Sequence, residues 1–491
     1  MSDAERELEH DEHQVTPLEL FFDLVFVFGI TQVTRLLAQD PTWAGVFPGM
    51  LVLAALWWAW SVYAWLTSAM DVDEGGVRLV MLASMGAMFG VALAVPGAFG
   101  DDAVLFGVAY LLVRLLHLVL SAVVGRDDPD RRGALLRFSP TAILGPSLLV
   151  IAGFLEGREP IAIWLVALAI DYLGPVVIGV GRGWRVAPEH FAERHALIIL
   201  IALGESIIAI GVGAGSELGL EVIVAAALGI VVVSALWWLY FDVAAIFARG
   251  RLTQAKDSLE LHRVALHAYS YLHLPMVAGI VLFSLGLKTT VGQAGEALDT
   301  VPAVALCGGA ALYLLAHIAF LFRTTGRVFR RRTVGAAGLL ALVPAAVAIP
   351  ALAALALVSA VCSLVVTYEV IHYRAGRVRV RHPELAERRA AAGVSSLSRH
   401  ELDRRGARFR ADHRIDVGGV VAVVLRTVRG VDLVVDVVDF REHDVLVDPA
   451  GTDVAVVPIL AAAEPRGGAP APGSNVEVVA VADDPNRHGL S

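Results

Sequence analysis

The sequence contains only two cysteines, Cys307 and Cys362, which excludes a secreted scaffold held together by disulfides. Both lie in apolar runs, so we expect them to be reduced, buried packing residues. Charged residues are also scarce, at 18% of the chain, whereas soluble domains carry about 25%. The net charge of −9 provides no basic surface for nucleic acid. The composition therefore excludes a secreted disulfide scaffold and gives no reason to expect a nucleic-acid-binding protein.

Signatures of common enzymes are missing from the sequence as well. It has no Walker loop, no paired-cysteine zinc spacing and no Gly-x-Ser-x-Gly elbow. The glycines at 179–183 do not make a dinucleotide fingerprint, because no strand precedes them. We therefore expect no catalytic residue, no metal and no cofactor.

Apolar residues are abundant instead. They make up 57% of 491 residues and cluster between about Glu19 and Tyr373, in runs near twenty residues long. A helix needs ~20 mainly apolar residues to cross a bilayer, and these runs are rich in Ala and Leu rather than alternating. The pattern predicts an all-α polytopic membrane protein with about twelve transmembrane helices. The expected spans are 19–37, 45–66, 76–95, 103–124, 138–155, 160–181, 194–213, 219–241, 262–287, 301–322, 334–350 and 351–373. The last two are separated by a turn near Pro350.

Basic residues in the connecting loops predict the orientation. The loops after even-numbered spans carry seventeen Lys and Arg, with Arg194 and Arg332 counted among them, whereas the loops after odd-numbered spans carry three. By the positive-inside rule, both termini are cytoplasmic. Residues 1–18 form an acidic leader without the basic start of a signal peptide, so the first span is expected to be an uncleaved anchor.

The two halves of the apolar region resemble each other. Ala-Leu-Trp-Trp at 55–58 recurs at 235–238, and the segment 23–29 aligns with 205–211 at an offset of 182. Tyr-Leu-Leu occurs at 110–112 and again at 313–315. These matches predict two six-helix repeats, residues 19–181 and 194–373, in the same orientation. A pathway would then lie between the halves, with Asp23 and Glu205 at equivalent points.

Acidic residues in the first span are the leading candidates for function. Glu19 and Asp23 are four residues apart and share a helix face. An ionised acid at mid-bilayer costs about 2.5–3.5 kcal/mol on insertion scales, so two in one turn need partners, water or protons. Glu19 is equally well explained as an interfacial residue of the first helical turn.

Further polar residues lie inside other spans. Arg114 and His117 are three apart in the fourth span, and Asp23, Asp171 and Glu205 are the acids available to Arg114. A fixed ion pair that only joins helices is as good an explanation as a switching pair. The remaining candidates for an intramembrane polar pathway are His195, Ser206, His273 and His317. Solvated or structural histidines remain the simpler alternative. The Trp residues at 57, 58, 60 and 65 are expected to be interfacial anchors.

The segment VTPLELFFDLVFVF at 15–28 is the most distinctive motif. Together with His195 and ALGES at 202–206, it resembles the bacterial low-temperature-requirement A family. DYLGP at 171–175 and Glu-Arg-His at 193–195 also look like that family's pattern, and the resemblance covers about 13–373. It implies a multi-pass protein of the bacterial inner membrane with a genetic link to growth in the cold. It does not imply a biochemical activity.

A more distant similarity concerns ion conduction. FDLVF at 22–26 looks like the Phe-Ser-Asp first-helix motif of potassium channels built from six-helix repeats. Phe22 stands where those channels have serine, and the second copy here, Gly204-Glu205, departs further. These departures argue against potassium selectivity and leave a two-repeat ion pathway open.

Residues 376–491 differ in composition and form a cytoplasmic tail. Residues 376–415 are Arg-rich and suit the anionic membrane surface, whereas 416–460 contain Val-rich runs typical of strands. The stretch 463–475 reads as a linker, and part of the tail is expected to be disordered.

Three functions follow from these observations. The first is a transporter or channel-like protein for small ions or protons, with the lipid bilayer as its surroundings and a homo-oligomer left open. The second is a scaffold or stress-adaptation protein that transports nothing and whose buried charges specify packing. The third is a membrane-embedded enzyme, for which Glu193, Arg194 and His195 give only a sketch of a site.

Overall fold

The computed structural model describes residues 15–68, 70, 75–157, 159–178, 186–215 and 219–372, and the backbone of three strands between 421 and 457. The chain divides into two units, Met1–His372 and Tyr373–Ser491. The described parts of the first unit are helical, as the hydropathy predicted. The leader residues 1–14, the span ends at 179–181 and 373, and the Arg-rich segment 376–415 lie outside the described residues.

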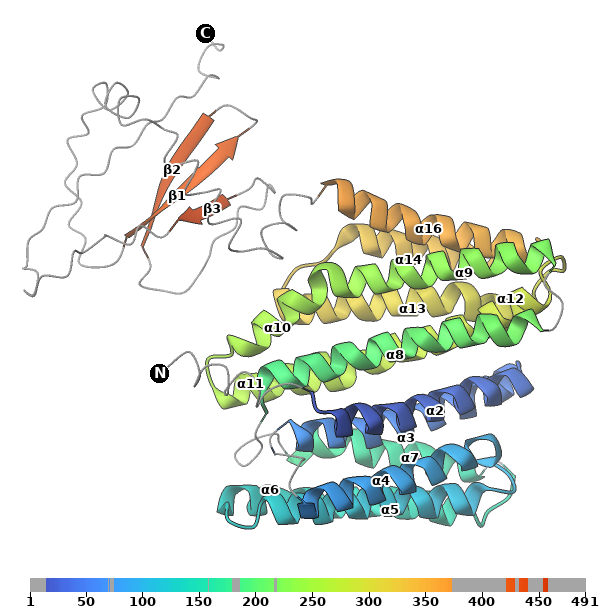
Figure 1. Ribbon diagram of the computed structural model, residues 1–491, viewed down its shortest axis with the longest axis vertical. Coiled ribbons are helices and arrows are strands. Elements are labelled where there is room, and N and C mark those ends of the chain that lie inside the picture. The colour runs from blue at the N-terminus through green and yellow to red at the C-terminus, as the bar shows by residue number, and fades with distance from the viewer. Residues whose placement is uncertain are drawn as a thin grey trace, which may run out of the picture. The chain divides into compact units, whose positions relative to one another are not determined.

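The first unit contains the following helices, labelled as in Figure 1: α2 (Pro17–Gln39), α3 (Trp43–Thr67), α4 (Gly75–Ala94), the 3-10 turn η1 (Val95–Gly97), α5 (Ala103–Val124), α6 (Pro129–Ala152), α7 (Glu159–Ile178), α8 (Pro188–Ala214), α9 (Leu220–Leu239), the π-helix η2 (Tyr240–Ala244), α10 (Ala245–Thr253), α11 (Ser258–Val264), the π-helix η3 (Ala265–Tyr271), α12 (His273–Gly292), α13 (Thr300–Thr325), α14 (Arg330–Ala341), α15 (Val343–Ala346) and α16 (Ala351–His372). We call α2–α7 the first half and α8–α16 the second half.

Eleven helices of the described residues are long and apolar enough to cross a membrane, one fewer than the sequence predicted. The span expected at 334–350 is broken into α14 and α15, because Pro344 cannot continue the hydrogen bonding of α14. The turn near Pro350 is confirmed, since α16 begins at the next residue, Ala351.

A capping box in the sequence sets the start of α2. Thr16 is the N-cap, and its side chain accepts a hydrogen bond from the Glu19 backbone N–H while the Glu19 carboxylate accepts from the Thr16 N–H. This reciprocal capping box is worth about 1 kcal/mol, and Pro17 at the first helical position adds a preset φ. The cap therefore fixes the first turn of α2 and, with it, the place of Glu19.

The same packing order occurs in both halves (Figure 1). In the first half, α2 packs on α3 and α4, α5 on α4 and α6, and α7 on α6 and α3. In the second half, α8 packs on α9 and α12, α13 on α12 and α14, and α16 on α14 and α9. The halves meet where α2 packs on α8 and α12, and we call this contact the seam.

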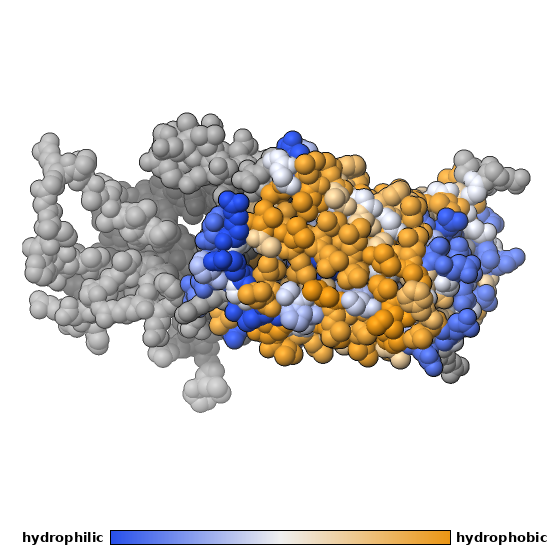
Figure 2. Space-filling model, turned by 90° about the horizontal axis from the view of Figure 1, so that it is seen from below, coloured by the Kyte–Doolittle hydropathy of each residue, from blue (hydrophilic) through white to orange (hydrophobic). Residues whose placement is uncertain are grey.

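The outer surface of the helical unit is apolar. Figure 2 shows a belt of hydrophobic residues between two hydrophilic ends. Large apolar side chains of the helical unit are exposed, among them Leu79, Val177 and Leu364 at 69%, 81% and 69%. Exposing apolar surface to water costs roughly 25 cal/mol of free energy per Å². Contact with lipid chains avoids this cost. The belt, with the eleven long apolar helices, makes this a multi-pass membrane architecture.

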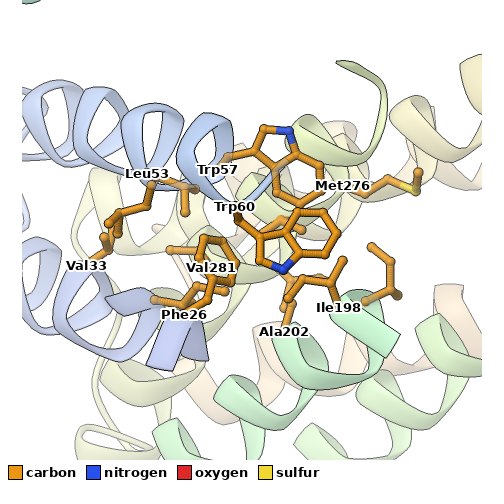
Figure 3. Close-up of a cluster of buried hydrophobic side chains, with 14 of the residues drawn as sticks. Phe26, Val33, Leu53, Trp57, Trp60, Ile198, Ala202, Met276 and Val281 are labelled. Carbon is orange, nitrogen blue, oxygen red and sulfur yellow. The ribbon is translucent and has the colours of Figure 1, made fainter. Parts of the chain in front are cut away.

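The interior at the seam is rich in aromatic residues. Trp57, Trp60 and Phe26 are fully buried and pack with Ile198 and Ala202 of α8 (Figure 3). The expected role of the tryptophans as interfacial anchors is therefore wrong for Trp57 and Trp60. Their indole N–H groups bind inside the protein instead.

The second unit contains β1 (Val421–Val428), β2 (Asp432–Asp439) and β3 (Val454–Val457). They form an antiparallel sheet in the order β2-β1-β3, with Val424 opposite Asp436 on one side and Val456 on the other. All three lie in the Val-rich stretch in which strands were expected.

Candidate functional site

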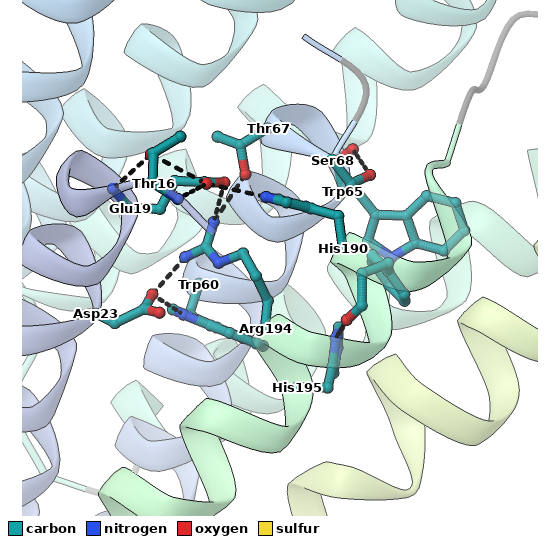
Figure 4. A network of polar contacts seen from close by, with 11 residues as sticks. Thr16, Glu19, Asp23, Trp60, Trp65, Thr67, Ser68, His190, Arg194 and His195 are labelled. Carbon is teal, nitrogen blue, oxygen red and sulfur yellow. Dashed lines mark hydrogen bonds and ion pairs between the residues drawn. The ribbon is translucent and has the colours of Figure 1, made fainter. Parts of the chain in front are cut away.

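A buried cluster of charged side chains lies where the N-terminal parts of α2 and α8 meet (Figure 4). Arg194 NH1 donates to Glu19 Oε1 at 3.1 Å, and Arg194 NH2 is paired with Asp23 Oδ1. His190 Nε2 lies 2.9 Å from Glu19 Oε2. The two acids are one helical turn apart on α2, and the two bases are one turn apart on α8. We call these four residues the seam cluster.

Helix α3 completes the surroundings of the seam cluster. Trp60 Nε1 donates to Asp23 Oδ1 at 2.8 Å, and Thr67 Oγ1 accepts from Arg194 NH1 at 2.7 Å. The Arg194 guanidinium carbon also lies 5.7 Å from the centre of a Trp60 ring, within range of a cation–π contact. Asp23 is thus held by Arg194 and by the indole N–H of Trp60. Glu19 is held by Arg194 and by the Thr16 backbone N–H, so both buried carboxylates have a cation and a neutral donor.

The formal charges of the seam cluster do not balance. Glu19 and Asp23 carry two negative charges and Arg194 one positive charge, so one negative charge is left when His190 is neutral. All three side chains are at most 1% exposed. Asp23 Oδ2 is buried and has no hydrogen-bond partner among the described residues. A buried unpaired charge is costly, so the cluster has capacity for one proton or one small cation.

Arg194 corrects the sequence interpretation. It was counted among loop residues, whereas it lies in the second turn of α8 with its side chain fully buried. The spacing His190–Arg194 repeats the spacing Glu19–Asp23, and this signal was available in the sequence. Glu19 lies in the first turn of α2, as its interfacial explanation expects, and its side chain is 1% exposed and paired with Arg194.

A separate ion pair lies inside the first half. Arg114 NH2 on α5 lies 3.1 Å from Asp171 Oδ1 on α7, and the Tyr110 hydroxyl donates to Asp171 Oδ2 at 3.3 Å. Asp171 is one of the three acids the sequence offered to Arg114, and Asp23 and Glu205 are not its partners. His117, one turn from Arg114, contacts the ring of Tyr63 edge-on at 5.4 Å.

Glu205 lies farther along the seam than Asp23. Thr31 of α2 donates to Glu205 Oε2 at 2.6 Å, and Ser206 hydrogen-bonds Ser284 of α12 at 2.8 Å. In the described part of the chain, Glu205 forms no ion pair. Arg194 contacts Asp23, and Glu205 contacts Thr31, so the residue numbers of contacting residues on α2 and α8 differ by 171 to 174. Asp23 and Glu205, which the sequence offset of 182 makes equivalent, thus lie at different points along the contact between α2 and α8.

Histidines of the second half form a third group. His273 Nε2 hydrogen-bonds the Tyr240 hydroxyl at 2.8 Å, and the Tyr240 ring lies 5.9 Å from His317. The His195 ring meets His273 edge-on at 5.3 Å. All of these rings are at most 1% exposed.

Arg332 of α14 ends this group and was missed by the sequence interpretation. It lies 3.1 Å from His317 Nδ1 and 2.7 Å from Glu369 Oε1, and it is only 5% exposed. Sequence reasoning placed Arg332 in a basic loop. Arg332 is the last of three consecutive arginines at 330–332, and the sequence gives no sign that it is the buried one.

The ten sequence-predicted residues thus occupy three places. The seam holds Glu19, Asp23, Glu205 and Ser206, the first half holds Arg114, His117 and Asp171, and the second half holds His195, His273 and His317. Within the described ranges, no group of three or more His, Cys, Asp or Glu side chains is arranged to bind a metal.

Comparisons with known proteins agree with the motif of the first helix. The family model described as bacterial low temperature requirement A protein matches residues 14–367. An uncharacterized protein of Rhizobium meliloti (strain 1021) is 30% identical over 337 residues, which are 65% of this chain and 79% of that protein. No solved structure matches the chain significantly. The chain belongs to the bacterial low temperature requirement A family.

Proposed function

We propose that this protein is a transporter or channel-like protein that moves small cations or protons along the seam between α2 and α8. The observation that carries the proposal is the charge of the seam cluster. Two buried carboxylates face one guanidinium, and Asp23 Oδ2 has no partner among the described residues. A membrane-embedded carboxylate with unused acceptor capacity suits a transported cation or proton.

The order of residues along the seam fits a closed pathway. The seam cluster lies at one end, and Glu205 with Thr31 lies eleven residues beyond Arg194 on α8, about 16 Å at 1.5 Å per residue. Between them, Phe26, Ile198 and Ala202 are fully buried (Figure 3). We infer that these apolar side chains block the seam and that conduction requires α2 and α8 to move apart.

We further propose that the two halves are a duplicated unit. Helices in the same order make the same contacts in each half. In the second half, α14 with α15 corresponds to α6 of the first half, because α14 packs between α13 and α16 as α6 packs between α5 and α7. Repeats in the same orientation give an axis along the membrane normal, which places α2 and α8 around that axis. With the basic loops inside, both termini are cytoplasmic and the membrane is the bacterial inner membrane.

The lipid bilayer and the transported ion are the partners in this proposal, and the protein catalyses no reaction. A homo-oligomer is compatible with it, because each chain contains the complete seam. The mass of the purified protein in detergent, measured by light scattering, determines the oligomeric state.

Ion flux into proteoliposomes tests the proposal. Asp23→Asn removes the charge of the carboxylate and keeps its shape, so flux is expected to fall at least about tenfold. The matched control is Glu189→Gln, which removes an acid of α8 that is paired at the surface with Arg249 at 3.1 Å. Control flux should equal that of the wild type. Equal flux in Asp23→Asn and wild type would refute the seam as the pathway.

A non-transporting scaffold is the second candidate, and the Arg114–Asp171 pair favours it. This pair is 0% and 2% exposed and joins α5 to α7 without reaching the seam. Such a pair specifies how helices pack. The scaffold function predicts no flux of any small cation or proton in the wild type, and measurable flux excludes it.

A further inference from the structure

His195 has one ring nitrogen in use and one free for another partner. Its Nδ1 lies 2.9 Å from the Phe191 backbone oxygen, and a carbonyl oxygen can only accept, so Nδ1 carries the hydrogen. In the neutral ring Nε2 then carries no hydrogen and can only accept a hydrogen bond. It is buried, and no partner for it exists among the described residues. Buried acceptors of this kind are rare in native proteins and point to a function or a bound group.

The hydroxyl of Tyr269 has the complementary property. It is a buried donor, and within the described part of the chain it also has no partner. The Tyr269 and His195 rings meet edge-on with centroids 5.3 Å apart. The two groups without partners in the described residues are thus an acceptor and a donor on neighbouring rings, a complementary pair that a side-chain rotation or one bridging water molecule would join.

Two tyrosines of this region lie in irregular helical backbone. Tyr269 lies in the π-helix η3, and Tyr240 lies in the π-helix η2. The Tyr240 hydroxyl is bound by His273, whose ring stacks on Tyr269 at 5.3 Å. Single-turn π-helices occur frequently at functional sites, because the extra residue redirects side chains at a small cost in stability.

The first half contacts this region through α3. The indole N–H of Trp57 donates to the Ser270 carbonyl of η3 at 2.7 Å, and Trp65 Nε1 donates to Ser270 Oγ at 2.8 Å. The Trp60 ring lies between Asp23, which it hydrogen-bonds, and His195, which it meets at 5.0 Å. Trp60 therefore connects His195 to the seam cluster.

The charged and titratable groups around His195 come from four directions. Arg194 precedes it on α8, Asp23 lies behind Trp60, and Tyr269 and His273 face it from η3 and α12. Beyond His273, Tyr240 leads to His317 and Arg332. When His190 is neutral, the seam cluster carries one uncompensated negative charge, which favours a positive charge nearby.

We propose that His195 and Tyr269 form a proton-binding site that serves the seam. A proton arriving from the seam binds Nε2, and the ring becomes an imidazolium while Nδ1–H stays on the Phe191 oxygen. The Tyr269 hydroxyl oxygen then accepts from Nε2–H, directly or through one water. Release of the proton from Nε2 restores the starting state. The site rests on the proposed transport function and identifies the proton as the transported or coupled ion.

The test uses the full chain in proteoliposomes and two measurements. Deuterium exchange at the histidine C2 position, read by mass spectrometry over pH, follows the titration of each imidazole separately. Proton flux is followed with pyranine inside the vesicles under a potassium diffusion potential. The variant is Tyr269→Phe, and the control is Tyr271→Phe, which removes a hydroxyl that donates to the Tyr172 carbonyl at 2.6 Å.

Tyr269→Phe is expected to change the pH profile of His195 exchange and to lower proton flux about tenfold, the size of one lost hydrogen bond. The control Tyr271→Phe should show the wild-type His195 profile and the wild-type proton flux. The exchange profile of His372 should be the same in the wild type and in both variants. An unaltered His195 profile in Tyr269→Phe overturns the proposal, as does a wild-type His195 whose exchange shows no titration with pH. If the profile changes but the wild type carries no flux, the site stands and the transport function fails.

Discussion

Arg194 determines the electrostatics of the seam, because it is the cation shared by both acids of α2. A single guanidinium with its fixed fork can bind two carboxylates that are one helical turn apart, whereas a lysine ammonium is a point charge. Removing it leaves two buried carboxylates without a cation.

The first prediction concerns this residue. Arg194→Met is expected to destabilise the protein by about 3–5 kcal/mol, the cost of breaking a buried ion pair from one side. Fluorescence-detected thermal unfolding in detergent measures the change. The matched control is Arg249→Met, whose pair with Glu189 is about half exposed and is worth at most about 1 kcal/mol.

The cause of the destabilisation can be checked by compensation. In the triple variant with Glu19→Gln and Asp23→Asn, Arg194→Met leaves no buried charge unpaired, so most of the lost stability should return. A single Arg194→Met variant as stable as Arg249→Met would show that the pair is not formed in the protein.

At the scale of elements, α12 and α13 approach each other most closely at glycines. A methyl group on Gly279 would lie 2.6 Å from the Tyr313 nitrogen, and one on Gly309 would collide with the Phe283 nitrogen. Small residues at such positions let helices in a membrane pack by van der Waals contact of their backbones. This contact positions His273 of α12 against the rest of the second half.

The second prediction tests this close approach with neighbouring glycines on one helix. Gly309→Ala is expected to destabilise the protein by about 1–3 kcal/mol, because the clash is with backbone and cannot be relieved by a rotamer change. Gly308→Ala places its methyl 3.4 Å from Val304 Cγ1 and should be nearly neutral. Thermal unfolding of both variants decides the matter, and equal melting temperatures would contradict the packing described for α12 and α13.

At the scale of the whole molecule, the orientation of the two halves is the property on which the proposed repeat depends. Two units of six crossings each keep the same orientation, so equivalent loops of both halves lie on one side. Maleimide labelling of single cysteines in intact cells tests this directly, after the buried Cys307 and Cys362 have been replaced by alanine.

The third prediction gives the pattern of labelling. Cysteines at Arg126 and Arg327 should be protected from a membrane-impermeant maleimide, because these loops carry the basic residues that stay inside. Cysteines at Phe154 and Glu296 should be labelled. Opposite accessibility of Arg126 and Arg327 would mean that the halves are inverted, which excludes a parallel repeat.

The sequence by itself determined the membrane class, most of the spans and the importance of the first helix. Hydropathy is a property of each segment alone, so spans can be recognised without knowing their neighbours. Eleven of the twelve expected spans contain a helix long and apolar enough to cross a membrane, whereas Pro344 divides the segment expected at 334–350 into α14 and α15. Glu19 and Asp23 were also recognisable, since two acids in one apolar turn need partners wherever they lie.

Only the tertiary structure decided which partner each charge has. Asp171 rather than Asp23 pairs with Arg114, and Arg194 is a buried residue of the seam rather than a loop residue. Pairing depends on the rotation and register of one helix against another, and these follow from packing of whole faces rather than from any single segment. For the same reason the offset of 182 could not show that Arg194 is the neighbour of Asp23 and Thr31 the neighbour of Glu205.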